Sequence, residues 1–442
     1  MGDGVAVIGG GLAGLATALA LGSAGHPVTV YEARPFLGGR ATSYPLNNAE
    51  DGNIVIDNCQ HILLRCCTNL IDFYKRLGVL DRIDFSREFF WLEPGGRMST
   101  MKRGLLPAPL HFTESFATLR FLSLADKFSV ATGLLSVRFE YGKRTDLDRI
   151  SMLDWLREKK QTPRAIERFW HQVLVSAISE ELDRMAAVHG LQVFYQGFLA
   201  KADAYEMGVP TIPLAELYGK EIWSRYEYIK LVERAAVQQV QIENGRVQGV
   251  TVNGETIQAE AYVLAVPFER VNALAPGLPL DLSAFTHAPI TGVHLWFDRP
   301  VTDLPHATLL DRTIQWMYNK GEGRHIQLVI SASRNLTEMP RAEVIELALK
   351  ELKEFFPRVA EATLERAHVV KEVRAVFSAT PGLEQHRPLS TTTIPNLFLA
   401  GDWTRTGWPA TMEGAVRSGY LAAEAVIRSM GSRQSFLIPD AA

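Results

Sequence analysis

The chain has 442 residues, of which 47% are apolar and 21% are charged. This composition can bury one large core or two ordinary ones, and it excludes a disordered protein. The formal net charge of -3 lacks the basic excess that a phosphate backbone requires, so we expect no nucleic-acid partner. The cysteines Cys59, Cys66 and Cys67 have no second Cys/His pair at zinc spacing, so we expect a reducing compartment and no metal site.

The first residues predict a βαβ unit. A strand-like run from Val5 to Ile8 precedes three glycines, an Ala- and Leu-rich helix to about Gly25, and a strand from Val28 to Tyr31. No basic leader precedes the first strand, and no stretch approaches the ~20 uninterrupted apolar residues that cross a bilayer. We therefore expect a cytoplasmic protein without a transmembrane helix.

A glycine fingerprint stands between the first strand and the first helix. Gly9, Gly11 and Gly14 follow the pattern G-x-G-x-x-G, which permits a tight turn, close approach of a pyrophosphate and close packing of the helix. Glu32 ends the second strand, where a carboxylate can accept hydrogen bonds from a ribose hydroxyl. The pattern predicts a dinucleotide site.

The next motif favours FAD over NAD. Gly38 and Gly39 let the backbone come near a cofactor, and the guanidinium of Arg40 can pair with a phosphate. We therefore predict FAD as the cofactor.

The C-terminal part of the chain supplies a second half of this site. A buried strand is expected up to Ala400, followed by Gly401 and by Asp402, which is placed to hydrogen-bond a ribityl hydroxyl. A helix is expected from Glu413 to Met430, and its small residues at four-residue spacing predict close packing. Its N-terminus would suit the negative charge around N1 and O2 of a reduced flavin.

Between these motifs the chain changes character. Residues 85–201 are mostly helical in pattern and rich in aromatics, and residues 235–267 predict a three-stranded meander because Asn-Gly pairs interrupt alternating residues. We expect an FAD-binding domain of residues 1–85, 202–285 and 386–442, interleaved with a substrate domain of residues 86–201 and 286–385.

In the order of these motifs, the chain resembles the superfamily of amine oxidases and phytoene desaturases. The resemblance implies an α/β fold with a Rossmann-like FAD-binding domain of the glutathione-reductase/amine-oxidase type and an interleaved α+β substrate domain. Residues 56–63, 290–301 and 401–415 are similar to a narrower family, the hydroxysqualene dehydroxylases, which are squalene-associated FAD-dependent enzymes. In one departure, Cys59 replaces the glycine expected in the Asp-Asn-Gly-Gln-His run of that family.

Transferred by position, the resemblance implies a set of cofactor contacts drawn from both ends of the chain. These are Gly9, Gly11, Leu12, Ala13, Gly14, Glu32, Ala33, Arg34, Gly39, Arg40, Val237, Gly401, Asp402 and Met412. Val237 is expected to contribute only a backbone contact to the adenine edge.

The implied reaction removes the hydroxyl of hydroxysqualene and delivers hydride from reduced FAD to give squalene. It requires a proton donor for the leaving hydroxyl and exclusion of water. His61 is the first candidate because its ordinary pKa suits neutral pH, and Asp57 and Glu413 are reserve candidates; each could instead be structural. Trp403 and Trp408 could face a carbocation or fill the core.

The expected partners follow from this substrate. It would be a long apolar polyprenyl molecule, and a separate reductase or free reduced flavin would supply the electrons. Residues 102–144 mix apolar and basic side chains, which suits peripheral attachment to the cytoplasmic face of an anionic membrane. The alternative for this segment is an amphipathic core helix with solvated basic residues.

Three other functions stay open at this point. A carotenoid desaturase would use the same FAD site and a similar apolar channel while moving hydride in the opposite direction. A flavin amine oxidase does not call for the apolar and basic segment. A non-catalytic FAD-binding or prenyl-lipid carrier is the remaining alternative.

Overall fold

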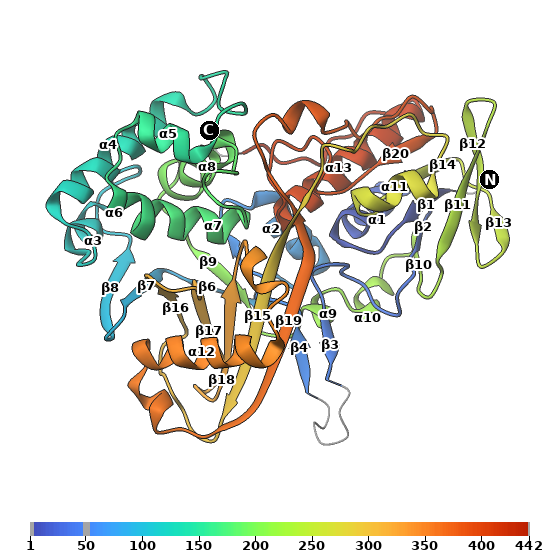
Figure 1. Ribbon diagram of the computed structural model, residues 1–442. Coiled ribbons are helices and arrows are strands. Elements are labelled where there is room, and N and C mark those ends of the chain that lie inside the picture. The colour runs from blue at the N-terminus through green and yellow to red at the C-terminus, as the bar shows by residue number, and fades with distance from the viewer. Residues whose placement is uncertain (1–3, 47–53, 441–442) are drawn as a thin grey trace.

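The computed structural model describes residues 4–46 and 54–440, and two large sheets organise it (Figure 1). The first is a parallel sheet of five strands in the order β10-β2-β1-β14-β20. The strands are β10 (Ile229–Val232), β2 (Val28–Tyr31), β1 (Val5–Ile8), β14 (Ala261–Leu264) and β20 (Leu397–Leu399). This sheet brings the two ends of the chain together and confirms the expected Rossmann-like unit.

Helix α1 (Leu12–Ser23) lies beside α13 (Met412–Ser429), and both pack against the parallel sheet. Nearly every residue of α1 is buried, which explains its lack of a polar face. The small residues predicted to pack do so: a Cβ on Gly419 would lie 2.4 Å from the carbonyl oxygen of Ala13. Helix α13 therefore locks the C-terminal motif against the N-terminal one.

The second large sheet has seven strands in the order β19-β15-β18-β17-β16-β7-β8. They are β19 (Leu364–Phe377), β15 (His287–Phe297), β18 (His325–Ile330), β17 (Trp316–Gly321), β16 (His306–Leu309), β7 (Glu88–Glu93) and β8 (Arg97–Lys102). Helix α12 (Arg341–Phe355) shares an apolar core with this sheet. In Figure 1 the long strands β15 and β19 run from the region of α13 down to α12.

A group of helices lies beyond β7 and β8, at the end of the molecule opposite the meander (Figure 1). Its helices are α3 (Thr113–Thr118), α4 (Leu124–Glu140), α5 (Met152–Glu158), α6 (Pro163–Ala165), the π-helical η2 (Ile166–His171), α7 (Gln172–Ile178), α8 (Ala187–Phe194) and the π-helical η3 (Tyr195–Leu199). The predicted helical character of residues 85–201 is thus confirmed from α3 onward, whereas the first part forms strands.

Smaller elements complete the chain. Sheets are formed by β3 (Ser43–Pro45) with β4 (Val55–Asp57), by β5 (Leu63–Leu64), β9 (Met207–Pro210) and β6 (Ile83–Ser86), and by the meander β11 (Val237–Glu243), β12 (Arg246–Val252) and β13 (Glu255–Ile257). The other helices are α2 (Thr68–Leu77), α9 (Leu214–Leu217), α10 (Lys220–Trp223), α11 (Phe268–Leu274) and the short 3₁₀ turns η1 (Leu80–Arg82), η4 (Arg334–Leu336), η5 (Pro357–Ala360) and η6 (Glu384–His386). The predicted meander is confirmed.

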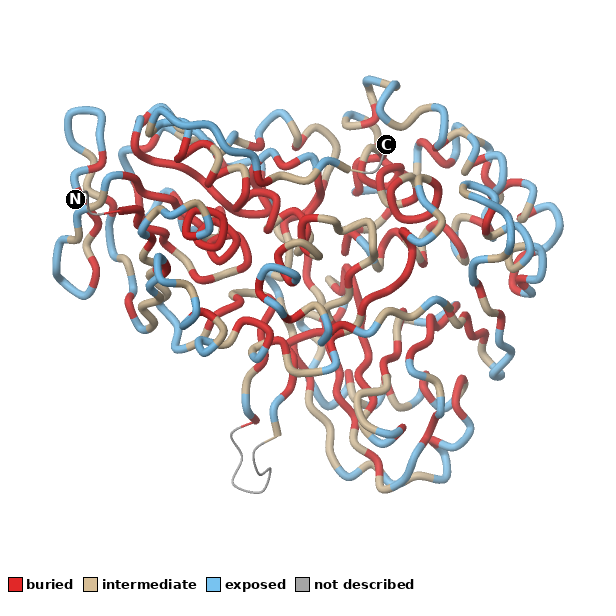
Figure 2. Tube along the Cα trace, turned by 180° about the vertical axis from the view of Figure 1, so that it is seen from behind, coloured by how far each residue is buried: buried red, intermediate tan, exposed pale blue. Residues whose placement is uncertain are grey.

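Burial follows this architecture. The parallel sheet with α1, and the centre of the molecule where both large sheets meet the helices, are buried, while the meander tips and the outer helices are exposed (Figure 2). In the part of the chain that the structure describes, no helix has the length and apolar character needed to cross a bilayer. The domain boundaries proposed from the sequence stay a prediction.

Candidate functional site

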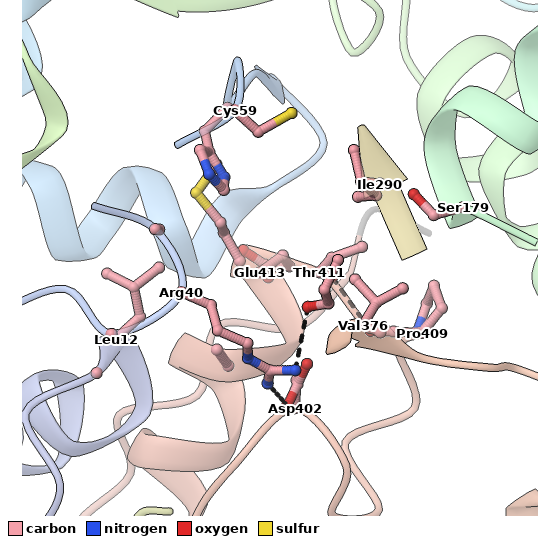
Figure 3. A pocket seen from close by; sticks show the side chains of 18 of the residues that line it. Leu12, Arg40, Cys59, Ser179, Ile290, Val376, Asp402, Pro409, Thr411 and Glu413 are labelled. Atoms are coloured by element: carbon pink, nitrogen blue, oxygen red, sulfur yellow. Dashed lines mark hydrogen bonds and ion pairs between the residues drawn. The ribbon is translucent and has the colours of Figure 1, made fainter. Parts of the chain in front are cut away.

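One cavity of about 740 Å³ connects the two halves of the molecule. Its wall is built from the turn after β1, the segment 58–67, the start of α13 and the face of the seven-stranded sheet. In Figure 3, Leu12, Arg40, Asp402 and Glu413 stand on one side and Ile290, Val376 and Ser179 on another. Every predicted site residue except Gly14 and Asp57 lines this cavity.

The N-terminus of α1 opens into the cavity. Its N-cap residue, Gly11, offers no side chain, and the first turn holds no acidic residue, so the free N–H groups and the positive end of the helix dipole face the space. A Cβ on Gly11 would meet only the Cα of Gly39, at 3.8 Å. A phosphate can therefore approach the backbone here.

Gly14 takes the packing role that the fingerprint predicts and is not among the residues that line the cavity. A Cβ at this position would lie 1.9 Å from the carbonyl oxygen of Gly9 and 3.2 Å from the side chain of Ala265. Its lack of a side chain permits α1 to pack against the sheet. Gly14 therefore shapes the turn and makes no direct contact with the cavity.

The end of β2 carries the predicted ribose-binding residue. The Glu32 carboxylate accepts hydrogen bonds from the backbone N–H groups of Gly10, at 2.7 Å, and Arg34, at 2.8 Å. These bonds fix the carboxylate at the cavity wall, beside Ala33 and close to Val237 of the meander. The contact of Glu32 with a ribose hydroxyl stays a prediction.

Arg40 joins the two halves of the site. Its guanidinium donates to Asp402 at 2.7 Å and to the carbonyl oxygen of Ala375 at 3.2 Å (Figure 3). The sequence placed Arg40 and Asp402 at separate parts of a cofactor and did not predict their ion pair. Gly401, at φ +150°, donates its N–H to the hydroxyl of Ser418 in α13, and this bond positions Asp402 at the sheet edge.

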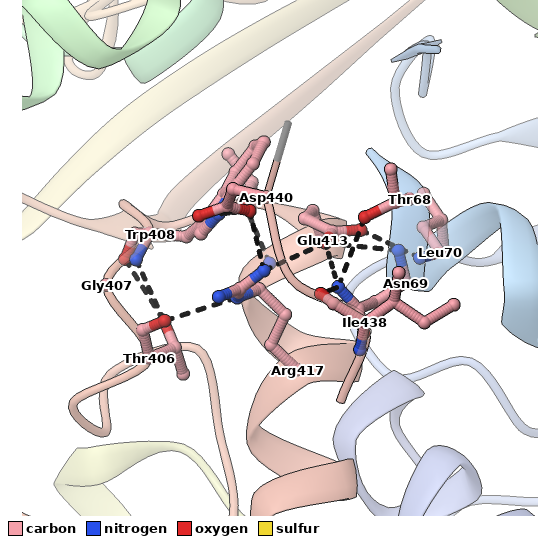
Figure 4. A network of polar contacts seen from close by, with 12 residues as sticks. Thr68, Asn69, Leu70, Thr406, Gly407, Trp408, Glu413, Arg417, Ile438 and Asp440 are labelled. Atoms are coloured by element: carbon pink, nitrogen blue, oxygen red, sulfur yellow. Dashed lines mark hydrogen bonds and ion pairs between the residues drawn. The ribbon is translucent and has the colours of Figure 1, made fainter. Parts of the chain in front are cut away.

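The first turn of α13 borders the same cavity through Met412 and Glu413. Thr411 caps the helix by accepting the N–H of Gly414. The buried Glu413 carboxylate accepts from the backbone N–H of Leu70 at 2.7 Å, and from the backbone and side-chain N–H groups of Asn69 (Figure 4). Complete burial raises the pKa of Glu413, although these donors and Arg417, 3.6 Å away, act against that shift.

His61 is placed as predicted, but its chemistry differs. Its ring reaches the cavity wall, and Nε2 lies 3.1 Å from Oδ1 of Asn58. Burial lowers the pKa of His61 to about 4, so the ring is uncharged at neutral pH. The ordinary pKa on which that choice relied is not kept, because desolvation disfavours the imidazolium. A proton-donor role for His61 stays a prediction.

Asp57 lies behind the wall and serves as a structural carboxylate. It accepts from the hydroxyl of Ser43 at 2.6 Å, from the N–H of Leu214 at 3.0 Å and from Nζ of Lys320 at 3.3 Å. Asp57 is not among the residues that line the cavity, and its role as a reserve acid stays a prediction. Its bonds tie β4 to α9 and to β17.

Three further residues considered in the sequence are Cys59, Trp403 and Trp408, and only Cys59 and Trp408 line the cavity. Cys59 is buried on the cavity wall, and burial raises the pKa of its thiol to about 12, so it is an uncharged apolar group that fills space. Trp408 lines the cavity with its Nε1 bonded to Asp440 (Figure 4), whereas Trp403 is core and donates to the carbonyl oxygen of Val266.

The far arm of the cavity was not predicted residue by residue. Its apolar wall comes from the seven-stranded sheet and from η3, and includes Phe89, Trp91, Phe198, Trp316, Tyr318 and Val329. Polar side chains interrupt it, among them Gln172, Ser176, Gln192 and Ser331. The aromatic richness of residues 85–201 pointed toward the members of this wall in that range, but nothing in the sequence marked those at 316, 318, 329 and 331.

Comparison with known proteins identifies the class. The family model of flavin-containing amine oxidoreductases matches residues 12–210 and 229–427, and the chain belongs to this family. It is 27% identical to the 15-cis-phytoene desaturase of Synechococcus elongatus, covering 96% of this chain and 95% of the relative. It is also 27% identical to the zeta-carotene desaturase of Synechocystis, covering 98% and 99%.

Solved structures agree on the fold. An oxidoreductase from Methanosarcina mazei superposes with a TM-score of 0.73 at 17% identity, covering 96% of this chain and 99% of that one. Cyclohexylamine oxidase from Brevibacterium oxydans gives a TM-score of 0.66 at 17% identity, covering 98% and 100%. The narrower similarity to hydroxysqualene dehydroxylases stays a prediction, because the relatives named here are desaturases.

FAD is the cofactor of this flavin-containing family, and the cavity fits it. The open N-terminus of α1 suits the pyrophosphate, Glu32 the ribose, and Asp402 the ribityl chain. Among the described residues, no group of three His, Cys, Asp or Glu side chains could hold a metal ion. The protein is therefore an FAD-dependent oxidoreductase.

Proposed function

We propose that this enzyme transfers hydride between FAD and a long polyprenyl substrate. The observation that supports this most is the continuity of one cavity from the dinucleotide end into an arm lined by aromatic and aliphatic side chains. An apolar wall excludes water from the reacting carbon and stabilises an extended hydrocarbon without ion pairs. Bound FAD would supply or accept the hydride.

Our first candidate reaction is the reductive dehydroxylation of hydroxysqualene to squalene. The hydroxyl takes up a proton and leaves as water with the C–O electron pair, and a hydride forms the new C–H bond. The polar side chains in the otherwise apolar arm, such as Gln172 and Gln192, favour a substrate that carries an oxygen. The local similarity of three segments to hydroxysqualene dehydroxylases supports the same choice.

The second candidate is desaturation of a carotenoid precursor, in which hydride leaves the substrate. The names of the curated relatives favour it, since they are phytoene and zeta-carotene desaturases over nearly the whole chain. On those names alone, desaturation would come first. In the dehydroxylation, a separate reductase or free reduced flavin would supply the electrons; in the desaturation, a separate acceptor would remove them.

For the dehydroxylation, Glu413 becomes the first candidate for the proton donor. Its carboxyl group lies on the cavity wall and has a raised pKa. Asp57 does not line the cavity, and the pKa of His61 is lowered. Glu413→Gln should abolish dehydroxylation. Asn69→Ala serves as its control, because it removes one bond from the same carboxylate and leaves the carboxyl group in place.

The two reactions are distinguished by their products. Holoenzyme is incubated anaerobically with hydroxysqualene and dithionite, and separately with phytoene and a quinone, and the extracted lipids are analysed by mass spectrometry. Squalene from the first mixture alone supports dehydroxylation. A product that has lost two hydrogens from the second mixture alone overturns it in favour of desaturation, and turnover in neither mixture overturns both.

A further inference from the structure

Helix α4 has its apolar and polar faces reversed relative to a helix that packs into a protein core. Its largest apolar side chains point to solvent: Leu124 is 84% exposed, Phe128 73%, Leu135 57% and Phe139 61%. Their spacing along the helix places them on one stripe. An ordinary surface helix carries charged residues on this stripe and buries its large apolar residues.

The buried face of α4 explains how the helix stays attached to the protein. It consists mainly of small and polar residues, with Asp126 accepting from the hydroxyl of Thr162 and Ser129 accepting from the N–H of Thr162. Gly133 lies against Trp170, where a Cβ would come within 2.6 Å of the ring. The exposed stripe is thus the stable arrangement of this helix, because its inner face is fully engaged.

A second exposed apolar group adjoins α4. Leu105, Leu106 and Leu110 stand on the segment before α3, and Leu105 is 95% exposed. This segment is tied to α3 through the bond from the N–H of Leu105 to Glu114, and α3 is tied to α4 by Lys127, which donates to the carbonyl oxygen of Ala117. We call the exposed residues of 103–112 and α4 the outer face; it lies at one end of the molecule (Figure 1).

Basic residues border the outer face. Arg103 and Arg120 line a shallow depression of about 430 Å³ together with Lys102 and the hydroxyls of Ser115 and Thr118. The structure gives the side chains of Arg103 and Arg120 no ion pair among the described residues, whereas Lys102 is paired with Glu88. Exposed cations beside an apolar stripe match the phosphates and acyl chains of an anionic bilayer surface.

Phe112 connects the outer face to the wall of the far arm of the cavity. Phe89 and Phe198 line the cavity, and the ring of Phe112 lies 6.0 Å from that of Phe198 between centroids. Phe112 belongs to the same segment as the exposed Leu110. Phe112 therefore links a residue of the cavity wall to the segment that carries the exposed leucines.

We propose that the outer face docks on the surface of an anionic lipid bilayer and that the substrate enters the cavity from the bilayer beside Phe112. The evidence for docking is the exposed apolar stripe of α4 and the basic residues Arg103 and Arg120 that border it. The entry route rests in addition on the proposed function, because it requires a substrate that dissolves in the bilayer. Leu124, Phe128, Leu135 and Phe139 lie among the acyl chains, and Arg103 and Arg120 contact phosphates.

Docking is tested by vesicle flotation of the FAD-loaded enzyme. The vesicles contain phosphatidylcholine alone or with phosphatidylglycerol, at low and high salt. Phe128→Ser with Phe139→Ser should lower the bound fraction at least about tenfold, because the variant loses the burial of two aromatic rings in an apolar phase. Arg103→Ser with Arg120→Ser should weaken binding to the mixed vesicles at low salt and have little effect on phosphatidylcholine alone.

The matched controls are Leu389→Ser and Val373→Ser, which remove exposed apolar side chains elsewhere on the molecule and should leave flotation unchanged. Wild-type enzyme that stays unbound on mixed vesicles at low salt overturns the docking. If the phenylalanine variant instead converts a dimer to a monomer in size-exclusion chromatography without changing flotation, the outer face is an interface between copies of the chain.

Entry from the bilayer is tested separately from the reaction. The Phe128→Ser, Phe139→Ser variant should lose at least about tenfold in turnover with substrate in vesicles, yet retain turnover with substrate in detergent micelles. Equal loss in both media overturns entry through this face. Absence of turnover by the wild type in micelles overturns the proposed reaction instead, and the flotation result stands independently.

Discussion

Gly419→Ala tests how the two ends of the chain form one cofactor site. An added Cβ would lie 2.4 Å from the carbonyl oxygen of Ala13, 2.8 Å from Cβ of Ala16 and 2.9 Å from the N–H nitrogen of Thr17. Alanine should favour the helix by about 1 kcal/mol over glycine, but overpacking costs about 1–3 kcal/mol. Because backbone atoms of α1 cannot rotate away, α1 and α13 must separate.

The separation should displace the Leu12–Ala13 turn from the C-terminal half of the cavity. We expect weaker FAD retention and a lower thermal unfolding temperature, measured by flavin fluorescence during gel filtration and by calorimetry of the holoenzyme. Gly197→Ala is the matched control, because its Cβ meets only the end of the Leu64 side chain, at 3.3 Å. Wild-type FAD affinity and stability in Gly419→Ala would refute the close-packing argument.

Three further predictions follow from the site. Asp402→Asn should weaken FAD binding about tenfold or more, by fluorescence titration, because it removes a charged partner of Arg40 at 2.7 Å; unchanged affinity would show that the ion pair is dispensable. His61→Ala should keep bound FAD and most turnover, since the ring is uncharged at neutral pH, and loss of turnover with flavin retained would restore His61 as an acid. The free energy of unfolding should fall as pH drops from about 6.5 to about 4, by roughly 1 kcal/mol per pH unit for each buried histidine. Burial lowers the pKa of His61 and His294 to about 4 and that of His325 to about 3, so the unfolded chain binds more protons in this range; urea titrations with a flat pH dependence would contradict this.

The cofactor half of the site could be predicted because its chemistry depends on backbone shape. A turn that admits a pyrophosphate needs glycine at Gly9 and Gly11, and an acidic residue after the second strand is set by the length of the βαβ unit. Such constraints act over short stretches of chain and so remain visible in sequence. Gly14 does not line the cavity, and the spacing alone could not reveal this, because a glycine required for helix packing has the same spacing as one that faces a ligand.

The substrate half could not be predicted in the same detail. The far arm takes its wall from strands and helices that are distant in sequence, and side chains such as Trp316 and Gln192 have nothing local that marks them. His61 was preferred because an ordinary imidazole pKa suits neutral pH, but burial lowers its pKa to about 4. Asp57, a reserve candidate, does not line the cavity and accepts a hydrogen bond from the N–H of Leu214. Protonation depends on the surrounding atoms, and these are set by tertiary packing.

The most direct test of the central claim is a single turnover observed at the flavin. The holoenzyme is photoreduced under anaerobic conditions, hydroxysqualene is added, and the visible flavin band is followed while squalene is extracted and quantified. We predict one squalene formed for each flavin reoxidised. Flavin that stays reduced in the presence of hydroxysqualene, while the oxidised enzyme is reduced by phytoene, would contradict dehydroxylation and establish the desaturase direction.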